Sequence, residues 1–428
     1  MIVSTLWTNL AIQGITFATS VLTARILGPV GRGELALVLL YPQLVAVITL
    51  MGTDRAVAVL AGRGELGRPI VAISKVVLLL SVPAIGLGYA ILRWRLADTH
   101  LAGLATMYLT YVPAAYFFML VSFLFNGTGD FARFNLVRLG FYSVNLALML
   151  AIWATAPTRS LDWVVVANLV SVFGVFGLAV CLLRGFRYSG NSGNETAKTN
   201  DVKSVLRLAL VFALPAALVQ FSGSIYQIVL EHQLGVGPLG LFVVYFSYSR
   251  ILSPVGSAIA SHVFYQGITG EGRDIARICR LSLIIYTACS LPLWLLARWL
   301  IPLIFGRSFV VDSWVIAFLL VSCLFGLLAD SLAEFLKGHK KVRADTEGMV
   351  IYLVAVGILG WWLATLWGLV GMALAMTMAD ILRYCYLMTN VGRFTGQVLG
   401  KFWQVTQSDI ATLLTSGKRA LVGVRTWR

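Results

Sequence analysis

The sequence predicts an all-α integral membrane protein of about twelve transmembrane helices, in two six-helix lobes around a central cavity. Three observations predict this class. Of the 428 residues, 59% are hydrophobic and only 12% are charged, whereas a soluble domain carries roughly 25% charged residues. Apolar stretches of about 20 residues, the length that spans a bilayer, recur along the whole chain. A pattern in the first half of the chain also returns in the second half.

Each apolar stretch is expected to form one helix, and the connections between them are too short for a separate soluble domain. The expected spans are 4–24, 36–53, 70–92, 101–125, 139–156, 161–183, 205–230, 239–262, 278–301, 313–335, 348–366 and 369–390.

The chain therefore divides into a lobe over residues 1–183 and a second lobe over 205–393. Residues 184–204, rich in Gly, Ser, Asn and Thr, are expected to form a cytoplasmic linker. The tail 394–428 mixes aromatic with basic residues, so it either lies on the membrane as an interfacial helix or is disordered.

The positive charge predicts the orientation of the chain. Of its 33 lysines and arginines, 23 fall in the even-numbered gaps and the tail, and seven in the odd-numbered gaps. Basic loops stay in the cytoplasm, so both termini are expected there. The net charge of +15 is thus spread over separate loops, which disfavours a nucleic-acid partner.

Two pairs of segments indicate an internal repeat. LGPVGRGELALVLLY (27–41) resembles LGVGPLGLFVVYFSY (234–248), and FNGTGDFARF (125–134) resembles LKGHKKVRAD (336–345). The two pairs occur in the same order and at nearly the same offset along the chain. Because six expected helices separate the copies, both halves enter the membrane in the same direction, related by an axis along the membrane normal.

Polar residues follow one face of the first expected helix, and a matching face of the seventh. Such residues are costly in a bilayer, so they face either a water-filled cavity or other helices to which they hydrogen-bond. The repetition of amide side chains between the halves favours the cavity. The two stripes are Asn9, Gln13, Thr16 and Ser20, and Gln220, Ser224, Gln227 and Glu231.

Arg250 lies about halfway along the eighth expected helix. An arginine at that depth needs water, a carboxylate or an anionic ligand. We interpret it as a contact for an anionic substrate. The alternative is an internal ion pair with Glu231, Asp330 or Asp380.

Arg25 and Arg55 lie near helix ends. They either contribute to the same anion-binding cavity or extend to the membrane surface, as long basic side chains commonly do.

Carboxylates within the expected helices are few. Asp330, Glu334 and Glu231 are the candidates for ion coupling, because such groups carry protons in transporters. Asp380 and Arg383 are three residues apart on one helix and are expected to pair with each other.

No catalytic motif of the GxSxG, HExxH or GxxxxGK[ST] type is present. We therefore expect no enzyme activity, no metal and no cofactor. The five cysteines lie in or beside apolar runs without metal-ligand spacing, and are expected to be free thiols.

Five segments together resemble the polysaccharide flippases of the O-antigen-repeat-unit type, within the multidrug/oligosaccharidyl-lipid/polysaccharide exporter superfamily. They are ARILGPVGRGELALVLLYPQLV (24–45), GTDRAVAVLAGRGE (52–65), FNGTGDFARFNLVR (125–138), QLGVGPLGLFVVYF (233–246) and IFGRSF (304–309), in the family's order.

The resemblance implies two lobes around a V-shaped cavity open to one side at a time. It implies flipping of a lipid-linked oligosaccharide, typically on undecaprenyl pyrophosphate, from the inner to the outer leaflet of a bacterial inner membrane. A polysaccharide polymerase and glycosyltransferases would be its partners. Arg250, Arg25 and Arg55 would suit the pyrophosphate. Many relatives carry charges in the middle of the seventh helix, where this chain has Tyr226 and Gln227; this departure argues against ion coupling there.

Two other functions fit the same composition. A cation-coupled multidrug exporter would share the architecture, but its cavity should be acidic, and Arg250 argues against that. A membrane-embedded polysaccharide polymerase or glycosyltransferase needs a long outward loop, and no expected loop is long enough.

Overall fold

The computed structural model confirms the predicted all-helical fold class. It describes residues 2–50, 52–66, 69–96, 99–155, 160–186, 201–254, 256, 259–260, 263, 275–339 and 341–404, and every regular element in these ranges is helical. The elements are α1 (Ile2–Leu50), α2 (Thr53–Gly62), α3 (Pro69–Arg95), α4 (Leu101–Tyr108), α5 (Tyr111–Gly127), α6 (Phe131–Thr155), α7 (Leu161–Arg184), α8 (Asp201–Leu234), α9 (Val236–Ser249), η2 (Arg250–Leu252), α11 (Ile275–Phe305), α12 (Ser313–Gly338), α13 (Val342–Thr395) and η4 (Leu399–Phe402).

Nine helical segments among the described residues are long and apolar enough to cross a membrane, so the chain is a multi-pass membrane protein. Two of them, α1 and α13, are each broken at a glycine with positive φ, Gly28 (φ 67°) and Gly368 (φ 58°). Glycine adopts this backbone conformation without the steric cost of a Cβ. Because two of the nine segments are each divided in two, there are eleven long apolar segments among the described residues. The shorter apolar helix Val236–Leu252 is the twelfth. About twelve spans is therefore correct.

The helix breaks follow the repeat that the sequence predicts. Gly28 interrupts α1, and its counterpart in the first repeated pair, Gly235 (φ 84°), separates α8 from α9. In the second repeated pair, α5 ends at Gly127 and α12 ends at the equivalent Gly338. The duplicated sequence thus gives the same local backbone in both halves.

The two copies of the glycine motif also contact each other. A Cβ added at Gly33 would overlap the carbonyl oxygen of Val236, and one added at Gly240 would overlap the carbonyl oxygen of Pro29. Pro29 and Val236 are equivalent positions of the two copies, as are Gly33 and Gly240, so the contact is symmetric between the repeats. Small residues allow such close approach of helix backbones in membranes.

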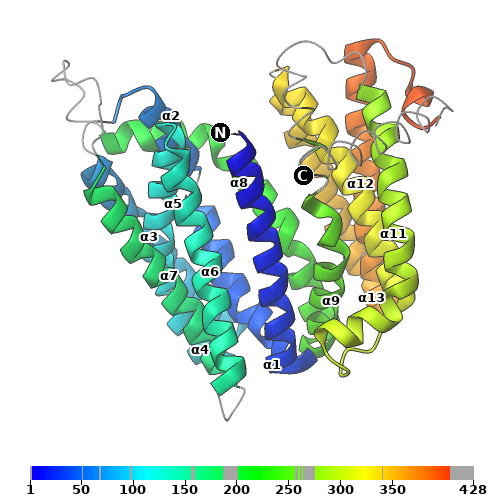
Figure 1. The fold of residues 1–428 in the computed structure, drawn as a ribbon, viewed down its shortest axis with the longest axis horizontal. Helices are drawn as coiled ribbons and strands as arrows, with labels where there is room; N and C mark the ends of the chain where they lie inside the picture. Colours follow the sequence, from blue (N-terminus) through cyan, green and yellow to red (C-terminus); the bar gives the residue numbers. More distant parts are fainter. Residues whose placement is uncertain are drawn as a thin grey trace, which may run out of the picture. The chain divides into compact units, whose positions relative to one another are not determined.

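The chain forms two compact units, each described here by itself. The first comprises Met1–Val244 with Pro302–Val310. Figure 1 shows α3, α5, α6 and α7 running side by side within it, and their contacts agree. Its core is a continuous cluster of buried apolar side chains from α1 to α3 and α5 to α8, including Val45, Tyr116 and Phe125.

The second unit comprises Tyr245–Ile301 with Val311–Arg428. Within it α12 packs along α13, and the core between them includes Leu332, Tyr384 and Leu387. Phe402 of η4 belongs to the same core, so the chain after α13 folds back onto this unit.

The predicted lobes 1–183 and 205–393 stay predictions. Most of the expected linker 184–204 and most of the tail 394–428 lie outside the described residues, which stop at 186, resume at 201 and end at 404.

The glycine contact can be tested by Gly33→Ala and Gly240→Ala. Each added methyl group meets a backbone carbonyl, and overpacking of this kind costs about 1–3 kcal/mol. We expect a lower apparent melting temperature of the purified protein, measured at one scan rate, for both variants. Gly14→Ala is the matched control, because a Cβ there has nothing within 4 Å. Equal melting temperatures for all three variants would contradict the close contact.

Candidate functional site

The polar face of the first helical segment, Ile2–Leu27, is largely uncovered. Asn9 and Gln13 are exposed, and neither side-chain amide makes a hydrogen bond within the described part of the chain. Thr16 donates to the carbonyl of Ile12 on its own helix at 2.8 Å, and Ser20 is buried. The amides are thus available for water or ligand.

The matching face of α8 is half-buried and partly satisfied within its own unit. The Gln220 amide lies 3.5 Å from the Ser224 hydroxyl, and the Gln227 amide donates to the Tyr226 hydroxyl at 3.1 Å. The two stripes therefore differ: the first is open, whereas the second is partly engaged in internal hydrogen bonds.

Glu231, at the end of the second stripe, belongs to a charged cluster that links three helices. Its carboxylate accepts from the guanidinium of Arg95 at 2.8 Å, joining α8 to α3. The Tyr41 hydroxyl of α1 lies between them, 3.3 Å from Arg95 Nε and 3.4 Å from the carboxylate. Both charged side chains are less than a quarter exposed. A pair this enclosed is costly to break on one side only, because the remaining charge is left unpaired.

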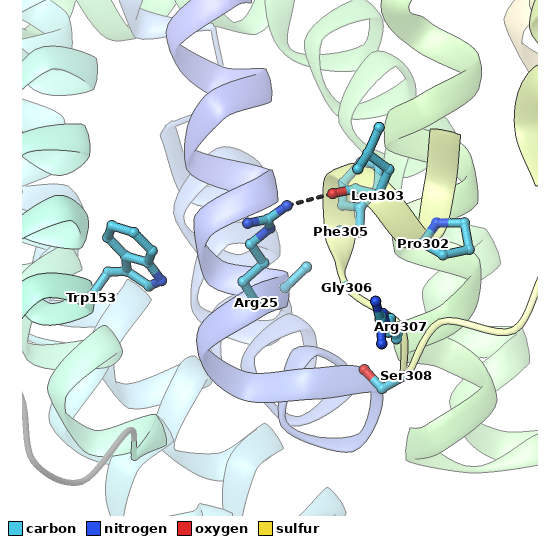
Figure 2. A pocket seen from close by; sticks show the side chains of 9 residues that line it. Arg25, Trp153, Pro302, Leu303, Phe305, Gly306, Arg307 and Ser308 are labelled. Carbon is cyan, nitrogen blue, oxygen red and sulfur yellow. Dashed lines mark hydrogen bonds between the residues drawn. The ribbon is translucent and has the colours of Figure 1, made fainter. Parts of the chain in front are cut away.

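Arg25 lies in the last turn before the break at Gly28, and its side chain reaches the end of α11. Its Nε donates to the carbonyl of Ile304 at 2.7 Å, and a terminal nitrogen donates to the carbonyl of Leu303 (Figure 2). The last carbonyls of a helix have no partner within the helix, so Arg25 caps this one. The guanidinium also lines an open pocket of about 710 Å³, with Trp153 and Arg307.

Arg55 lies at the start of α2 and is exposed. Its guanidinium is 4.0 Å from Asp54 and lies over the ring of Phe123 at 5.6 Å. An exposed pair at this distance adds little stability, so the charge of Arg55 remains available.

Arg250 begins the short helix η2 and is exposed. Its guanidinium lies over the ring of Phe246, 4.3 Å from the centroid. Among the described residues it forms no ion pair with Glu231, Asp330 or Asp380, although it attracts Asp380 electrostatically. In the described part of the chain, Arg250 is therefore not neutralised by any of the three carboxylates that are the alternatives to an anionic substrate.

Asp330 and Glu334 belong to a network on α12 and α13. Arg383 pairs with Asp330 at 2.9 Å and with Asp345 at 3.4 Å. Lys337 pairs with Asp345 at 3.0 Å and with Glu334 at 2.9 Å. Each of the two candidate carboxylates therefore has a cationic partner, although the network holds three carboxylates and two cations.

The pairing of Asp380 with Arg383 expected from their spacing is wrong. Asp380 accepts a hydrogen bond from the Ser322 hydroxyl at 2.5 Å, while Arg383 points to Asp330 and Asp345. Tertiary packing places other partners close by, on α12 and on the part of α13 before the break at Gly368, and these replace the neighbour three residues away. Nothing in the local spacing indicated them.

No group of three or more His, Cys, Asp or Glu residues in the described ranges could hold a metal ion. Among the predicted site residues, the described geometry brings Glu231 to Arg95 and Arg25 to Arg307. Arg95 and Arg307 were not candidates, because the expected spans 70–92 and 278–301 leave each of them in a connection between helices.

Comparison with known proteins supports the fold but not a family. No protein-family model and no curated protein sequence matches the chain. Solved structures do match. A MATE-family multidrug resistance transporter of the MOP superfamily, in an inward-facing conformation, is 18% identical, with a TM-score of 0.64 over 91% of this chain and 96% of that chain.

Two further matches have the same architecture. The lipid II flippase MurJ, in an inward closed conformation, is 12% identical with a TM-score of 0.69, over 95% of this chain and 91% of that one. A MOP-superfamily transporter from Pyrococcus furiosus is 14% identical with a TM-score of 0.63, over 90% and 94%. At these identities the likeness shows a shared fold: the chain has the fold of MOP-superfamily transporters.

The role of the Glu231 cluster can be tested by a double-mutant cycle with Glu231→Gln and Arg95→Gln. Each single change leaves the other charge unpaired, so we expect each to destabilise the protein, with a coupling of about 1–3 kcal/mol. The measurement is thermal or denaturant unfolding of the purified protein. Arg93→Gln is the control, since Arg93 is exposed on the same turn of α3. Additive effects would show that the pair contributes no interaction energy.

The openness of the two stripes can be tested by thiol labelling of Gln13→Cys and Gln220→Cys, in a chain whose five cysteines are replaced. We expect both to react with a charged reagent, Gln13→Cys faster because its position is more exposed. Ile12→Cys should react slowly, because Ile12 is buried on the same helix. If neither stripe position reacts, the polar residues serve only to hold helices together.

Proposed function

Starting from a fold shared with a lipid II flippase and with multidrug transporters, we propose that this chain is a flippase for a lipid-linked oligosaccharide. It moves a glycan on an undecaprenyl-pyrophosphate-type carrier from the inner to the outer leaflet of a bacterial inner membrane, by alternating access, for surface polysaccharide synthesis. It is a transporter, not an enzyme, and both termini lie in the cytoplasm. A polysaccharide polymerase and glycosyltransferases act with it on the same glycan.

Arg250 carries this proposal. It is an exposed arginine within the apolar stretch 239–262, and the described residues offer it no ion pair. Guanidinium groups match phosphate oxygens in geometry and charge. Arg55 is a second exposed arginine whose nearest carboxylate is 4.0 Å away. Asn9 and Gln13 supply amides that suit the hydroxyl groups of a sugar.

A cation-coupled multidrug exporter is the competing function, and the MATE-family match favours it at the level of fold. Such a protein needs a carboxylate to attract a cation. Among the described carboxylates, Glu231, Asp330 and Glu334 are each bound to a basic side chain. Among the predicted site residues that the structure describes, the exposed charges without a close partner are those of Arg250 and Arg55. Asp380, by contrast, is buried against Ser322, and this balance favours an anionic substrate.

The proposal can be tested by complementation in a bacterium that lacks its own flippase for a surface glycan. We expect the wild-type chain to restore the polymer. Arg250→Ala should reduce it by about tenfold or more, because a charged hydrogen bond to the substrate is lost. The measurement is surface polymer at matched protein level.

Arg250→Lys and Arg93→Gln are the controls. The lysine keeps the charge but loses the bidentate geometry and should retain part of the activity, whereas Arg93→Gln should retain all of it. Full activity of Arg250→Ala contradicts the anion contact. Protection against cationic drugs without any glycan export would favour the multidrug function.

A further inference from the structure

We propose that the pocket beside Arg25 and Arg307 binds the phosphate of a membrane-lipid headgroup. The headgroup belongs either to an ordinary phospholipid or to the lipid carrier of the transported glycan, and the second of these rests on the proposed function. All residues that line the pocket belong to the first unit, and Arg250 is not among them.

The pocket lies at the membrane face opposite the N-terminus. The segment Ile2–Leu27 is roughly 40 Å long as a helix, enough to cross the bilayer once. Arg25 stands at its far end. Trp153 occupies the last turn of α6, and Arg307 follows the end of α11. This is the level at which lipid headgroups meet protein, and by the predicted orientation it is the outer face.

The lining is cationic. Two guanidinium groups, the Ser308 hydroxyl and the Trp153 indole surround about 710 Å³, and no residue that lines the pocket carries a carboxylate. Two like charges in one pocket repel each other, so an anion between them is favoured. The volume is that of a typical small-ligand site.

Arg25 is fixed in place before any ligand arrives. Two of its five N–H groups donate to the carbonyls of Ile304 and Leu303, and Figure 2 shows the second of these hydrogen bonds. The other three have no partner among the described residues. A guanidinium held in this way loses little entropy when it binds phosphate.

Arg307 is presented by the turn that ends α11. Gly306 adopts φ 120°, a conformation that favours glycine and turns the chain after Phe305. The Arg307 side chain is exposed and has no hydrogen bond or ion pair in the described ranges. Its whole donor set is therefore available to the pocket, with Ser308 beside it as a further donor.

The test is equilibrium binding to the full chain in zwitterionic nanodiscs. The probes are farnesyl pyrophosphate, inorganic pyrophosphate as a soluble competitor, and phosphatidylglycerol added to the bilayer. We expect Arg307→Gln to weaken binding of the lipid probe by about tenfold or more, because a charged hydrogen bond is lost. Arg25→Lys, which keeps the charge and is safer for folding than a neutral change, should weaken it less. Arg93→Gln should bind as the wild type does.

The competitors identify the source of the phosphate. Farnesyl pyrophosphate binding that resists phosphatidylglycerol supports the carried lipid. Displacement by phosphatidylglycerol also supports a headgroup site, filled by ordinary phospholipid. Inorganic pyrophosphate binding as tightly as the farnesyl probe overturns the lipid part of the proposal, and Arg307→Gln binding like the wild type overturns the site.

The outcome can be separated from that of the proposed function. Arg307-dependent binding combined with no glycan export leaves the headgroup site standing and removes the flippase. Glycan export combined with unchanged lipid binding in Arg307→Gln leaves the flippase standing and removes the headgroup site.

Discussion

The rest of the first unit depends on the close approach of two backbones at Gly33 and Gly240. A side chain at either position would strike a carbonyl oxygen of the opposite copy. The contact lies a few residues from the breaks at Gly28 and Gly235, and therefore near Arg25 and Glu231. Both of these charged residues reach partners far along the chain, and such contacts require the helix ends to meet closely. A small-residue contact of this kind is how membrane helices gain packing energy, because lipid offers no hydrophobic driving force between them.

The polar groups of the apolar helices fall into two sets with different consequences. Glu231 and Asp330 are bound to basic side chains of other helices and hold helices together, whereas Glu334 is bound to Lys337 of its own helix. Asn9, Gln13 and Arg250 are exposed and have no hydrogen-bond or ion-pair partner among the described residues. Because uncompensated polar groups are expensive in a bilayer, the second set is where a function is to be sought. The sign of the available charge then favours an anion over a cation.

Much of the fold could be predicted from the sequence, because its determinants are local. Apolar length gives the spans, and glycines that need positive φ, such as Gly28 and Gly235, give the breaks. The repeated glycine motif did not predict the symmetric contact. It identified Gly33 and Gly240 as equivalent positions, but not as positions that touch, since equivalence follows from the repeated sequence and contact from packing.

The sequence by itself determined the membrane class, the approximate helices, the repeat, and the polar and charged residues that a bilayer makes costly. Only the tertiary structure decided how those residues are used. It paired Glu231 with the distant Arg95, turned Arg383 from Asp380 towards Asp330, and placed Arg25 on the end of α11. The physical reason is that the cost of a buried charge depends on its own residue type and depth, which a sequence records. How far that cost is compensated depends on the distance and direction of a partner side chain, which only the folded chain fixes.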